Sequence, residues 1–299
     1  MDTRAYSSSA SVHLALHAYP QITIDGRPRP LKLKPGLALL AYLYRRGRPV
    51  GRDVLAALLW PDAPAGRGRA RLRRLVHEMH GTLGHAVIAG DVDALWLAGT
   101  VDSDLQRTRA AIESADAAVL CEPQAAGLLE GFTLDSDAFA DWLDSERRVL
   151  RAALVRALER AIDFALATQQ DEATERAGDA LLRLDPTAEA GHIARLAACA
   201  ARGDAAAVEG AYFEAARLWR EELGLRPSAR IEAAYAQAQS RLQRGDAAAS
   251  IVVLWHATPD RAGGPGPQRL RALLDRLARR HRVAVIERRA ADLTEPASA

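Results

Sequence analysis

The chain has 299 residues, of which 49% are hydrophobic and 26% charged, so it can bury the cores of about two globular domains of roughly 150 residues each. No run of about 18 apolar residues occurs, and the N-terminal segment has no apolar signal core, which argues against a membrane protein or a secreted one. Cys121 and Cys199 fit no disulfide or ligand pattern, so we expect a reducing, cytoplasmic environment.

The formal net charge of +2 conceals an uneven distribution along the chain. Residues 1–99 hold 14 Lys and Arg against 7 Asp and Glu, residues 100–246 hold 17 against 26, and residues 247–299 hold 9 against 5. A basic first third beside an acidic middle predicts a module that faces nucleic acid, joined to a module with another task. Only two of the 40 basic residues are lysines, so arginine is abundant everywhere and its placement matters more than its number.

The first elements after a disordered N-terminus (residues 1–11) are predicted to be strands. Apolar residues alternate with polar ones over residues 12–18 and 21–25, as in half-buried strands. Asp25-Gly26 is a hairpin-turn signal, because glycine takes positive φ without steric cost. Leu31 and Leu33 alternate with two lysines and predict a return strand over residues 31–34, completing a small antiparallel sheet.

Three helices and a hairpin are expected next. Pro35 suits the first turn of the first helix, and Gly47 ends it, with an apolar stripe of Leu37, Leu40, Leu43 and Tyr44. A short second helix runs from Gly51 to Pro61, with Val54, Leu55, Leu58 and Leu59 facing inward. The third covers residues 67–84, and two apolar runs around Asp91–Asp93 read as a closing hairpin. These are the ingredients of a winged helix, whose last helix enters the major groove.

The third helix carries the candidate DNA contacts. Its buried stripe is predicted to be Leu72, Val76, Met79 and Leu83, which leaves several guanidinium groups on the other face. Arginine can fork onto phosphate oxygens or onto the edge of guanine. We expect base contacts from Arg73, Arg74 and His77, and phosphate contacts from Arg52, Arg67 and Arg69, with Arg71 and His80 on the same segment completing the candidate DNA-binding set.

Residues 102–245 are expected to be helical almost throughout. A long amphipathic helix starts near Phe139, and helix–helix turns at Gln169 and Gly203, 34 residues apart, fit the period of tetratricopeptide repeats. Gly224 and Pro227 precede a final helix over residues 230–243. The tail reads as strand 251–255, loop 261–267, helix 268–281 and strand 283–287, a β-α-β unit too short to fold alone.

The chain resembles bacterial transcriptional activators of the Streptomyces antibiotic regulatory protein type. The resemblance lies in residues 35–84 and 128–227, and its clearest pieces are LLAYLYRRGRPVGRDVLAALLWPD (39–62), RARLRRLVHEMHGTLG (69–84), LLEGF (128–132), FADWLDSER (139–147) and WREELGLRPS (219–228). It implies an OmpR-type winged helix over residues 12–99, a bacterial transcriptional activator domain built of tetratricopeptide-like helices over residues 100–246, and a β-α-β extension over residues 247–299. The expected fold is mainly α with small β.

Two functions follow from these expectations. The first is a cytoplasmic, nucleoid-associated transcription factor that binds double-stranded DNA, whose helical domain supplies dimer or protein contacts and, as the resemblance implies, helps to recruit RNA polymerase. The second is a helical-repeat adaptor whose winged helix no longer reads DNA, in keeping with Asp91 and Asp93 in its wing. A regulatory fragment of a longer ATPase or cyclase is a third idea.

Catalytic and metal sites are not predicted. No nucleophile–base arrangement or phosphate-binding loop stands out in the sequence. His77, His80 and His85 lie close together, but a zinc site needs four ligands and no matched partner occurs nearby. We therefore expect no enzymatic activity, cofactor, metal or membrane partner.

Overall fold

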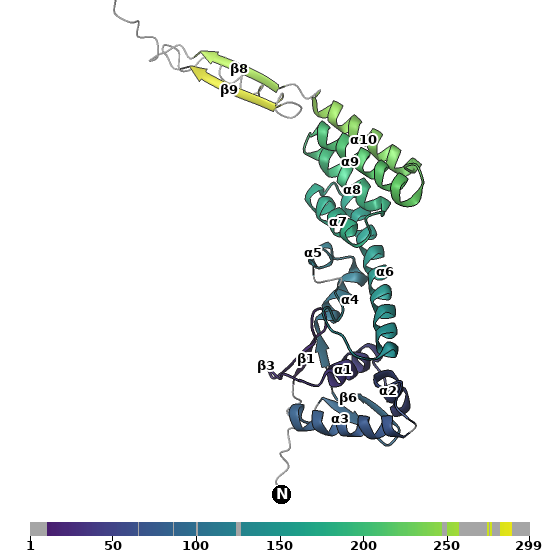
Figure 1. Ribbon diagram of the computed structural model, residues 1–299. Helices are drawn as coiled ribbons and strands as arrows, with labels where there is room; N and C mark the ends of the chain where they lie inside the picture. Colours follow the sequence, from purple (N-terminus) through teal and green to yellow (C-terminus); the bar gives the residue numbers. More distant parts are fainter. Residues whose placement is uncertain are drawn as a thin grey trace, which may run out of the picture. The chain divides into compact units, whose positions relative to one another are not determined.

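The computed structural model describes residues 11–64, 66–85, 87–99, 101–123, 127–246, 250–256 and 282–288, together with Leu274 and Arg276. The chain forms two compact units, residues 1–198 and 199–299, which we describe separately. It is mainly helical with small sheets, as predicted (Figure 1). The predicted division into domains at residues 99 and 246 stays a prediction.

A four-stranded sheet opens the first unit. Its strands are β1 (Val12–Ala15), β2 (Gln21–Ile24), β3 (Arg27–Pro28) and β7 (Val101–Ser103), in the order β3-β2-β1-β7. Strand β1 runs antiparallel to β2 and parallel to β7, with Val12 opposite both Ile24 and Val101. The predicted Asp25-Gly26 turn is confirmed, since both residues take positive φ, 50° and 73°.

The predicted return strand over residues 31–34 is wrong. Strand β3 stops at Pro28, and Pro30 has no N–H with which to continue a ladder. Leu31 is instead buried beside α1, which begins at Lys34 with a proline in its first turn. Residues 31–34 therefore alternate because the segment that leads into α1 packs its leucines against the core, and not because the segment pairs in a sheet.

The three predicted helices are α1 (Lys34–Arg46), α2 (Arg52–Leu59) and α3 (Arg67–Leu83). Gly47 caps α1 in the left-handed conformation, with φ 59°. The predicted hairpin forms from β5 (Ile88–Gly90) and β6 (Ala94–Leu97), and β4 (Val50–Gly51) adds to it in the order β4-β6-β5. Val54, predicted to face inward, is 52% exposed, because it lies about 100° around α2 from the buried Leu55.

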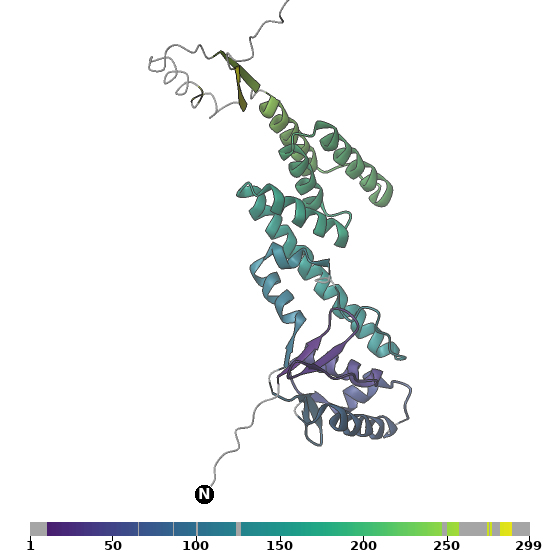
Figure 2. The same ribbon diagram turned by 90° about the vertical axis from the view of Figure 1, so that its left-hand side faces the viewer.

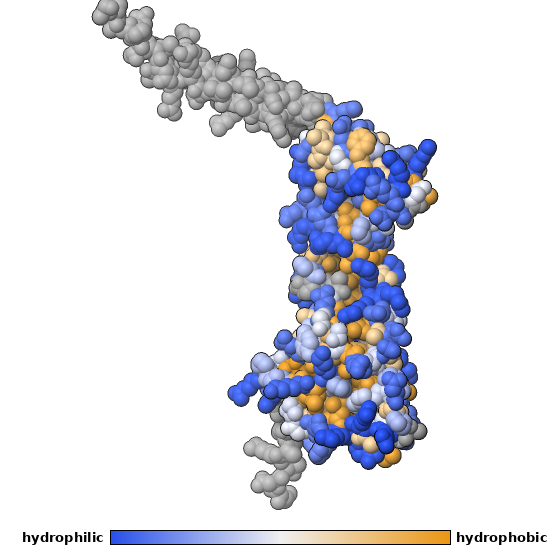
Figure 3. Space-filling view, viewed as in Figure 1, coloured by the Kyte–Doolittle hydropathy of each residue, from blue (hydrophilic) through white to orange (hydrophobic). Residues whose placement is uncertain are grey.

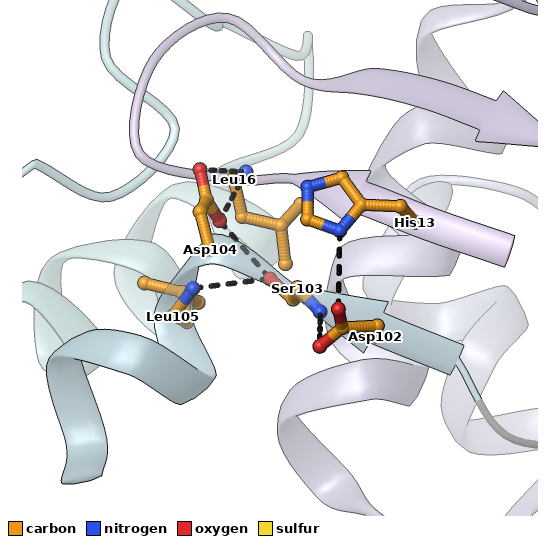
Figure 4. Close-up of polar contacts among 6 residues, drawn as sticks. All are labelled: His13, Leu16, Asp102, Ser103, Asp104 and Leu105. Atoms are coloured by element: carbon orange, nitrogen blue, oxygen red, sulfur yellow. Dashed lines mark hydrogen bonds and ion pairs between the residues drawn. The ribbon is translucent and has the colours of Figure 1, made fainter. Parts of the chain in front are cut away.

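Polar contacts join the first sheet to α4 (Asp104–Ser114). Asp104 accepts hydrogen bonds from the backbone N–H groups of Leu16 and His17 at 2.9 and 3.0 Å. Figure 4 shows the contact with Leu16 and the cap that Ser103 forms with the N–H of Leu105. The buried His17 ring bridges the carbonyl oxygen of Gly127 and the hydroxyl of Thr108. Helix α4 is thus held on the same scaffold as the N-terminal sheet.

One apolar core extends from the first sheet and α1–α3 into the start of the next helices. It includes Leu128, Leu129 and Phe132 of a loop, and Phe139 and Leu143 of α6 (Asp137–Ala167), which confirms the long predicted helix. A second core lies between α4, α5 (Ala117–Leu120), α6, α7 (Asp171–Leu184) and the first part of α8 (Glu189–Ala201). The predicted boundary at residue 99 therefore does not separate two cores.

The predicted turns of the helical repeat are confirmed. Gln169 and Gly203 both take positive φ, 55° and 72°. The residue after each donates back to a carbonyl five residues earlier, from Gln170 to Ala165 at 2.9 Å and from Asp204 to Cys199 at 3.2 Å. The same helix ending therefore recurs after 34 residues, as a repeated helical pair requires.

The second unit contains α9 (Ala205–Leu218), a π-helical turn (Trp219–Leu223) and α10 (Ala229–Asp246), which confirms the helix expected after Pro227. Strands β8 (Ser250–His256) and β9 (Arg282–Arg288) pair in parallel, with Ser250 opposite Arg282. Both predicted tail strands are therefore present. The predicted loop 261–267 and most of the helix 268–281 lie outside the described residues, apart from the helical Leu274 and Arg276.

Candidate nucleic-acid interface

Helix α3 is fixed by a continuous apolar face. Its buried residues are Gly68, Leu72, Leu75, Val76, Met79 and Leu83, and they include all four predicted positions. Gly68 allows α2 to approach closely, because a Cβ there would lie 3.2 Å from the Cβ of Ala56. The orientation of α3 is therefore set by its inner side, which leaves the outer side available for another task.

Five of the predicted contact residues lie on the outer side of α3. These are Arg67, Arg71, Arg73, Arg74 and His77, all exposed. In two perpendicular views α3 lies at the end of the first unit farthest from α7 (Figures 1 and 2). Hydrophilic side chains predominate along this edge in the space-filling view (Figure 3). The segment predicted to meet DNA is thus an accessible, mostly polar face.

The guanidinium groups of this face are largely available. Within the ranges that the structure covers, Arg67, Arg71 and Arg73 make no side-chain hydrogen bond or ion pair. Arg74 pairs with Glu78 one turn later at 2.8 Å, and its side chain remains 84% exposed. An exposed pair at this spacing contributes only about 0.3–0.5 kcal/mol, so a phosphate or a base edge can displace the carboxylate.

Arg69 is held elsewhere, by Asp53 of α2. Its Nε and Nη2 atoms donate to the two carboxylate oxygens, the second at 2.6 Å. This hydrogen bonding and the negative charge of Asp53 raise the pKa of Arg69. The pair links the start of α3 to α2 and adds to the contact that the apolar face already sets, although the Asp53 side chain is 73% exposed.

Arg52 and His80 also bond within the protein. The Nε of Arg52 donates to the carbonyl oxygen of Asp91 at 2.8 Å, and the Nε2 of His80 lies 3.0 Å from the carbonyl oxygen of Ile88. The His80 ring packs against that of His85, with centroids 4.2 Å apart. Both contacts hold the β5–β6 hairpin against the helices, so the eight predicted residues divide into five on one open face and three in structural contacts.

The hairpin turn carries features that apolar periodicity does not predict. Asp91 accepts hydrogen bonds from the N–H groups of Asp93 and Ala94, both at 2.8 Å, and these bonds lower the pKa of its carboxyl group. Val92, between the two aspartates, is 82% exposed. The only sequence signal for this arrangement was the turn motif Asp91-Val92-Asp93. Two carboxylates at the turn oppose its approach to a phosphate backbone.

Groups of three or more His, Cys, Asp or Glu side chains that could hold a metal ion are absent from the described part of the chain. The free thiol of Cys121 has a pKa raised by burial, which disfavours the reactive thiolate. Among the described helices, none combines the length and apolar composition needed to cross a bilayer.

Comparisons with known proteins identify one module and its relatives. Residues 98–239 match the family described as "Bacterial transcriptional activator domain". A segment of 69 residues is 41% identical to the transcriptional regulatory protein EmbR of Mycobacterium tuberculosis and of Mycobacterium bovis. This segment makes up 23% of the chain but only 18% of the length of EmbR.

The fold also has a relative among solved structures. A structure described as "Mycobacterium tuberculosis EmbR in complex with low affinity phosphopeptide" matches with a TM-score of 0.58 and 24% identity, covering 78% of this chain and 66% of that one. The chain therefore contains a bacterial transcriptional activator domain, is homologous to EmbR over a shared segment, and has an EmbR-like fold. The family resemblance seen in the sequence is confirmed.

Proposed function

Residues 98–239 form a bacterial transcriptional activator domain, and from that premise we propose that the whole chain is a DNA-binding regulator of transcription. Residues 12–99 act as its winged helix, with α3 as the helix that enters the major groove. This arrangement has the three helices, the closing hairpin and the order along the chain that the motif requires. The chain has no enzymatic role in this proposal.

The observation that carries the proposal is the open cationic face of α3. Arg67, Arg71 and Arg73 have no partner in the described protein, and Arg74 has only an exposed one. An unpaired guanidinium group can bind an anion without first breaking an ion pair within the protein, so these arginines bind phosphate at a lower free-energy cost than paired ones. Arg73, Arg74 and His77 take the base contacts, and Arg67 and Arg71 the phosphate contacts.

In this proposal the activator domain makes the protein contacts of the regulator. It binds RNA polymerase or a second copy of the chain. The domain is joined to the DNA-reading half through Asp104, His17 and the shared apolar core. Binding of α3 to a promoter would therefore set the orientation of at least the first part of the helical domain beside the start site.

The experiment selects bound fragments from the organism's own genomic DNA at two salt concentrations. The intact chain is expected to enrich a discrete set of sites, with an affinity that falls by about 0.9 log units per contacted phosphate for each log unit of salt. Arg73→Ala/Arg74→Ala should lose that enrichment, because each base contact contributes about 1–3 kcal/mol of discrimination. Arg109→Ala is the matched control, since Arg109 forms an exposed pair with Glu113 on α4 at the same spacing of four residues.

The competing function is a protein-interaction adaptor that does not read DNA. The acidic hairpin turn and the structural contacts of Arg52, Arg69 and His80 are the observations in its favour. It predicts that Arg73→Ala/Arg74→Ala leaves regulation unchanged and that no genomic fragment is enriched at either salt concentration. That outcome would replace the DNA-binding proposal.

A further inference from the structure

The β5–β6 hairpin ends in a small acidic knob, formed by Asp91, Val92 and Asp93. Val92 is 82% exposed and stands between two exposed carboxylates. A valine this exposed leaves most of its apolar surface in water. The knob combines an apolar tip with negative charge on both sides, which suits a shallow apolar site with a positive rim.

The knob is held rigidly in shape. Besides the two backbone hydrogen bonds to the Asp91 carboxylate, the N–H of Asp91 donates to the carbonyl of Ala94 at 3.1 Å. From α2, the backbone N–H and the Nε of Arg52 donate to the carbonyls of Asp93 and Asp91, both at 2.8 Å. A turn fixed before binding loses little conformational freedom when it docks.

The same unit carries a groove of the opposite character at the edge of the first sheet. Its volume is about 270 Å³, and its lining is mostly apolar: Tyr19, Pro20, Gln21, Ile22, Pro28, Arg29, Pro30, Leu31, Lys32 and Leu37. An apolar cavity of about 150 Å³ already holds a benzene molecule, so an aliphatic side chain has room here. Edge packing on Phe132, with ring centroids 5.7 Å apart, supports the Tyr19 wall.

Positive charge surrounds this groove. Arg29 and Lys32 line it, and Arg27 and Lys34, each two residues away from one of them along the chain, are also exposed. None of the four makes a side-chain ion pair or hydrogen bond to any described residue. The space-filling view shows hydrophilic side chains projecting around β3 (Figure 3). The residues of the knob are not among those that line the groove, so the chain does not fill the groove with its own knob.

We propose that the acidic knob of one copy of this chain docks into the basic-rimmed groove of a second copy, with Val92 on the apolar floor and Asp91 and Asp93 facing Lys32 and Arg29. The two surfaces match in two ways. The knob offers an apolar side chain for the apolar groove, and its negative charge complements the positive charge around the groove, as in the core and the rim of a protein interface. A duplex is a poor occupant for the knob, because its carboxylates repel phosphates.

The contact has a defined symmetry. Knob and groove are different surfaces of one chain, so a single contact is heterologous and leaves one copy with a free groove and the other with a free knob, to which further copies can add. Two copies that dock reciprocally close instead into a twofold dimer. The contact is small, and interfaces below about 1,200 Å² belong to weak, transient complexes, so we expect association that depends on concentration. The proposal does not rest on DNA binding.

The experiment is sedimentation velocity of the full chain without DNA, over a concentration series and at two salt concentrations. The intact chain should show an average mass that rises with concentration and falls with salt. A knob variant, Val92→Ser/Asp93→Asn, keeps the Asp91 carboxylate that shapes the turn. A groove variant, Arg29→Gln/Lys32→Gln, keeps the apolar lining. Each alone should associate at least tenfold more weakly than the intact chain.

An equimolar mixture of the two variants is the decisive sample. One variant has an intact groove and the other an intact knob, so the mixture should form dimers and nothing larger. Val149→Ser is the matched control, since Val149 is 59% exposed on α6, and it should associate like the intact chain. Circular dichroism melting of every variant separates loss of docking from loss of folding.

Three results would overturn the proposal: an intact chain that stays monomeric throughout, variants that associate like the intact chain, or a mixture without dimers. Lower DNA affinity of the groove variant with unchanged association would instead assign Arg29 and Lys32 to a duplex. Failure of the genomic selection leaves this test unaffected, so the two proposals can fail independently.

Discussion

Helices α3 and α6 each contain five arginines, yet they are different surfaces. In α3 the only acidic residue is Glu78, whereas α6 holds six acidic residues beside its five arginines. In α6, Arg147 donates to the carbonyls of Leu128 and Leu129, both at 3.0 Å, and Arg160 donates to that of Ile112. The number of arginines therefore says little about anion binding; the surrounding acids and the partners of each guanidinium group decide it.

Charge reversal should separate the two helices most strongly. Arg71→Glu on α3 is expected to weaken DNA binding by about 100-fold, because a carboxylate placed against phosphates costs several kcal/mol. Arg151→Glu on α6 should leave affinity within about twofold. Fluorescence anisotropy with a selected DNA fragment measures both. Equal losses in the two variants would mean that net charge, rather than the face of α3, governs binding.

For the stability of the fold, by contrast, we expect an arginine of α6 to matter most. Arg147→Ala leaves two backbone carbonyls without their charged donor, and we expect the free energy of unfolding to fall by about 2 kcal/mol. Arg148→Ala, at an exposed position with no described side-chain contact, should change it by less than about 0.5 kcal/mol. Denaturant unfolding followed by circular dichroism gives both values, and similar losses would contradict a structural role specific to Arg147.

A smaller effect is expected at the edge of the α3 face. Arg67→Ala should reduce the slope of log affinity against log salt by about 0.9 and weaken all DNA sequences alike, as the loss of one phosphate contact requires. Arg69→Ala should leave the slope unchanged, because its guanidinium bonds to Asp53. A slope lowered by Arg69→Ala and not by Arg67→Ala would exchange the roles of these two residues.

The smallest effect concerns the hairpin turn at low pH. Backbone hydrogen bonds lower the pKa of Asp91 in the folded state, so its stabilising contribution is present above the ordinary value of 3.8 and is lost as pH falls through the folded value. The melting temperature of the intact chain should therefore approach that of Asp91→Asn as the solution is acidified. Asp62→Asn, at an exposed position with no described hydrogen bond to its carboxylate, is the control and should lower the melting temperature at neutral pH by less than Asp91→Asn does.

Apolar spacing was sufficient to locate the helices, because burial of one stripe imposes a period of about 3.6 residues wherever a helix packs. This is why the positions of α1, α3 and α6 and the 34-residue turns at Gln169 and Gly203 were predicted correctly. Apolar spacing misleads where the local pattern and the packing disagree. Residues 31–34 alternate without forming a strand, and Val54 is apolar but lies outside the buried stripe of α2.

The sequence alone also determined that a cluster of guanidinium groups lies opposite the apolar stripe of α3. Which of these groups are free was decided only by the tertiary structure, because their partners are distant in the chain. Asp53 lies 16 residues from Arg69, and the carbonyl of Asp91 lies 39 residues from Arg52. Helical periodicity reports the direction of a side chain but not the group that it meets, and hydrogen bonds to distant residues depend on how the elements pack.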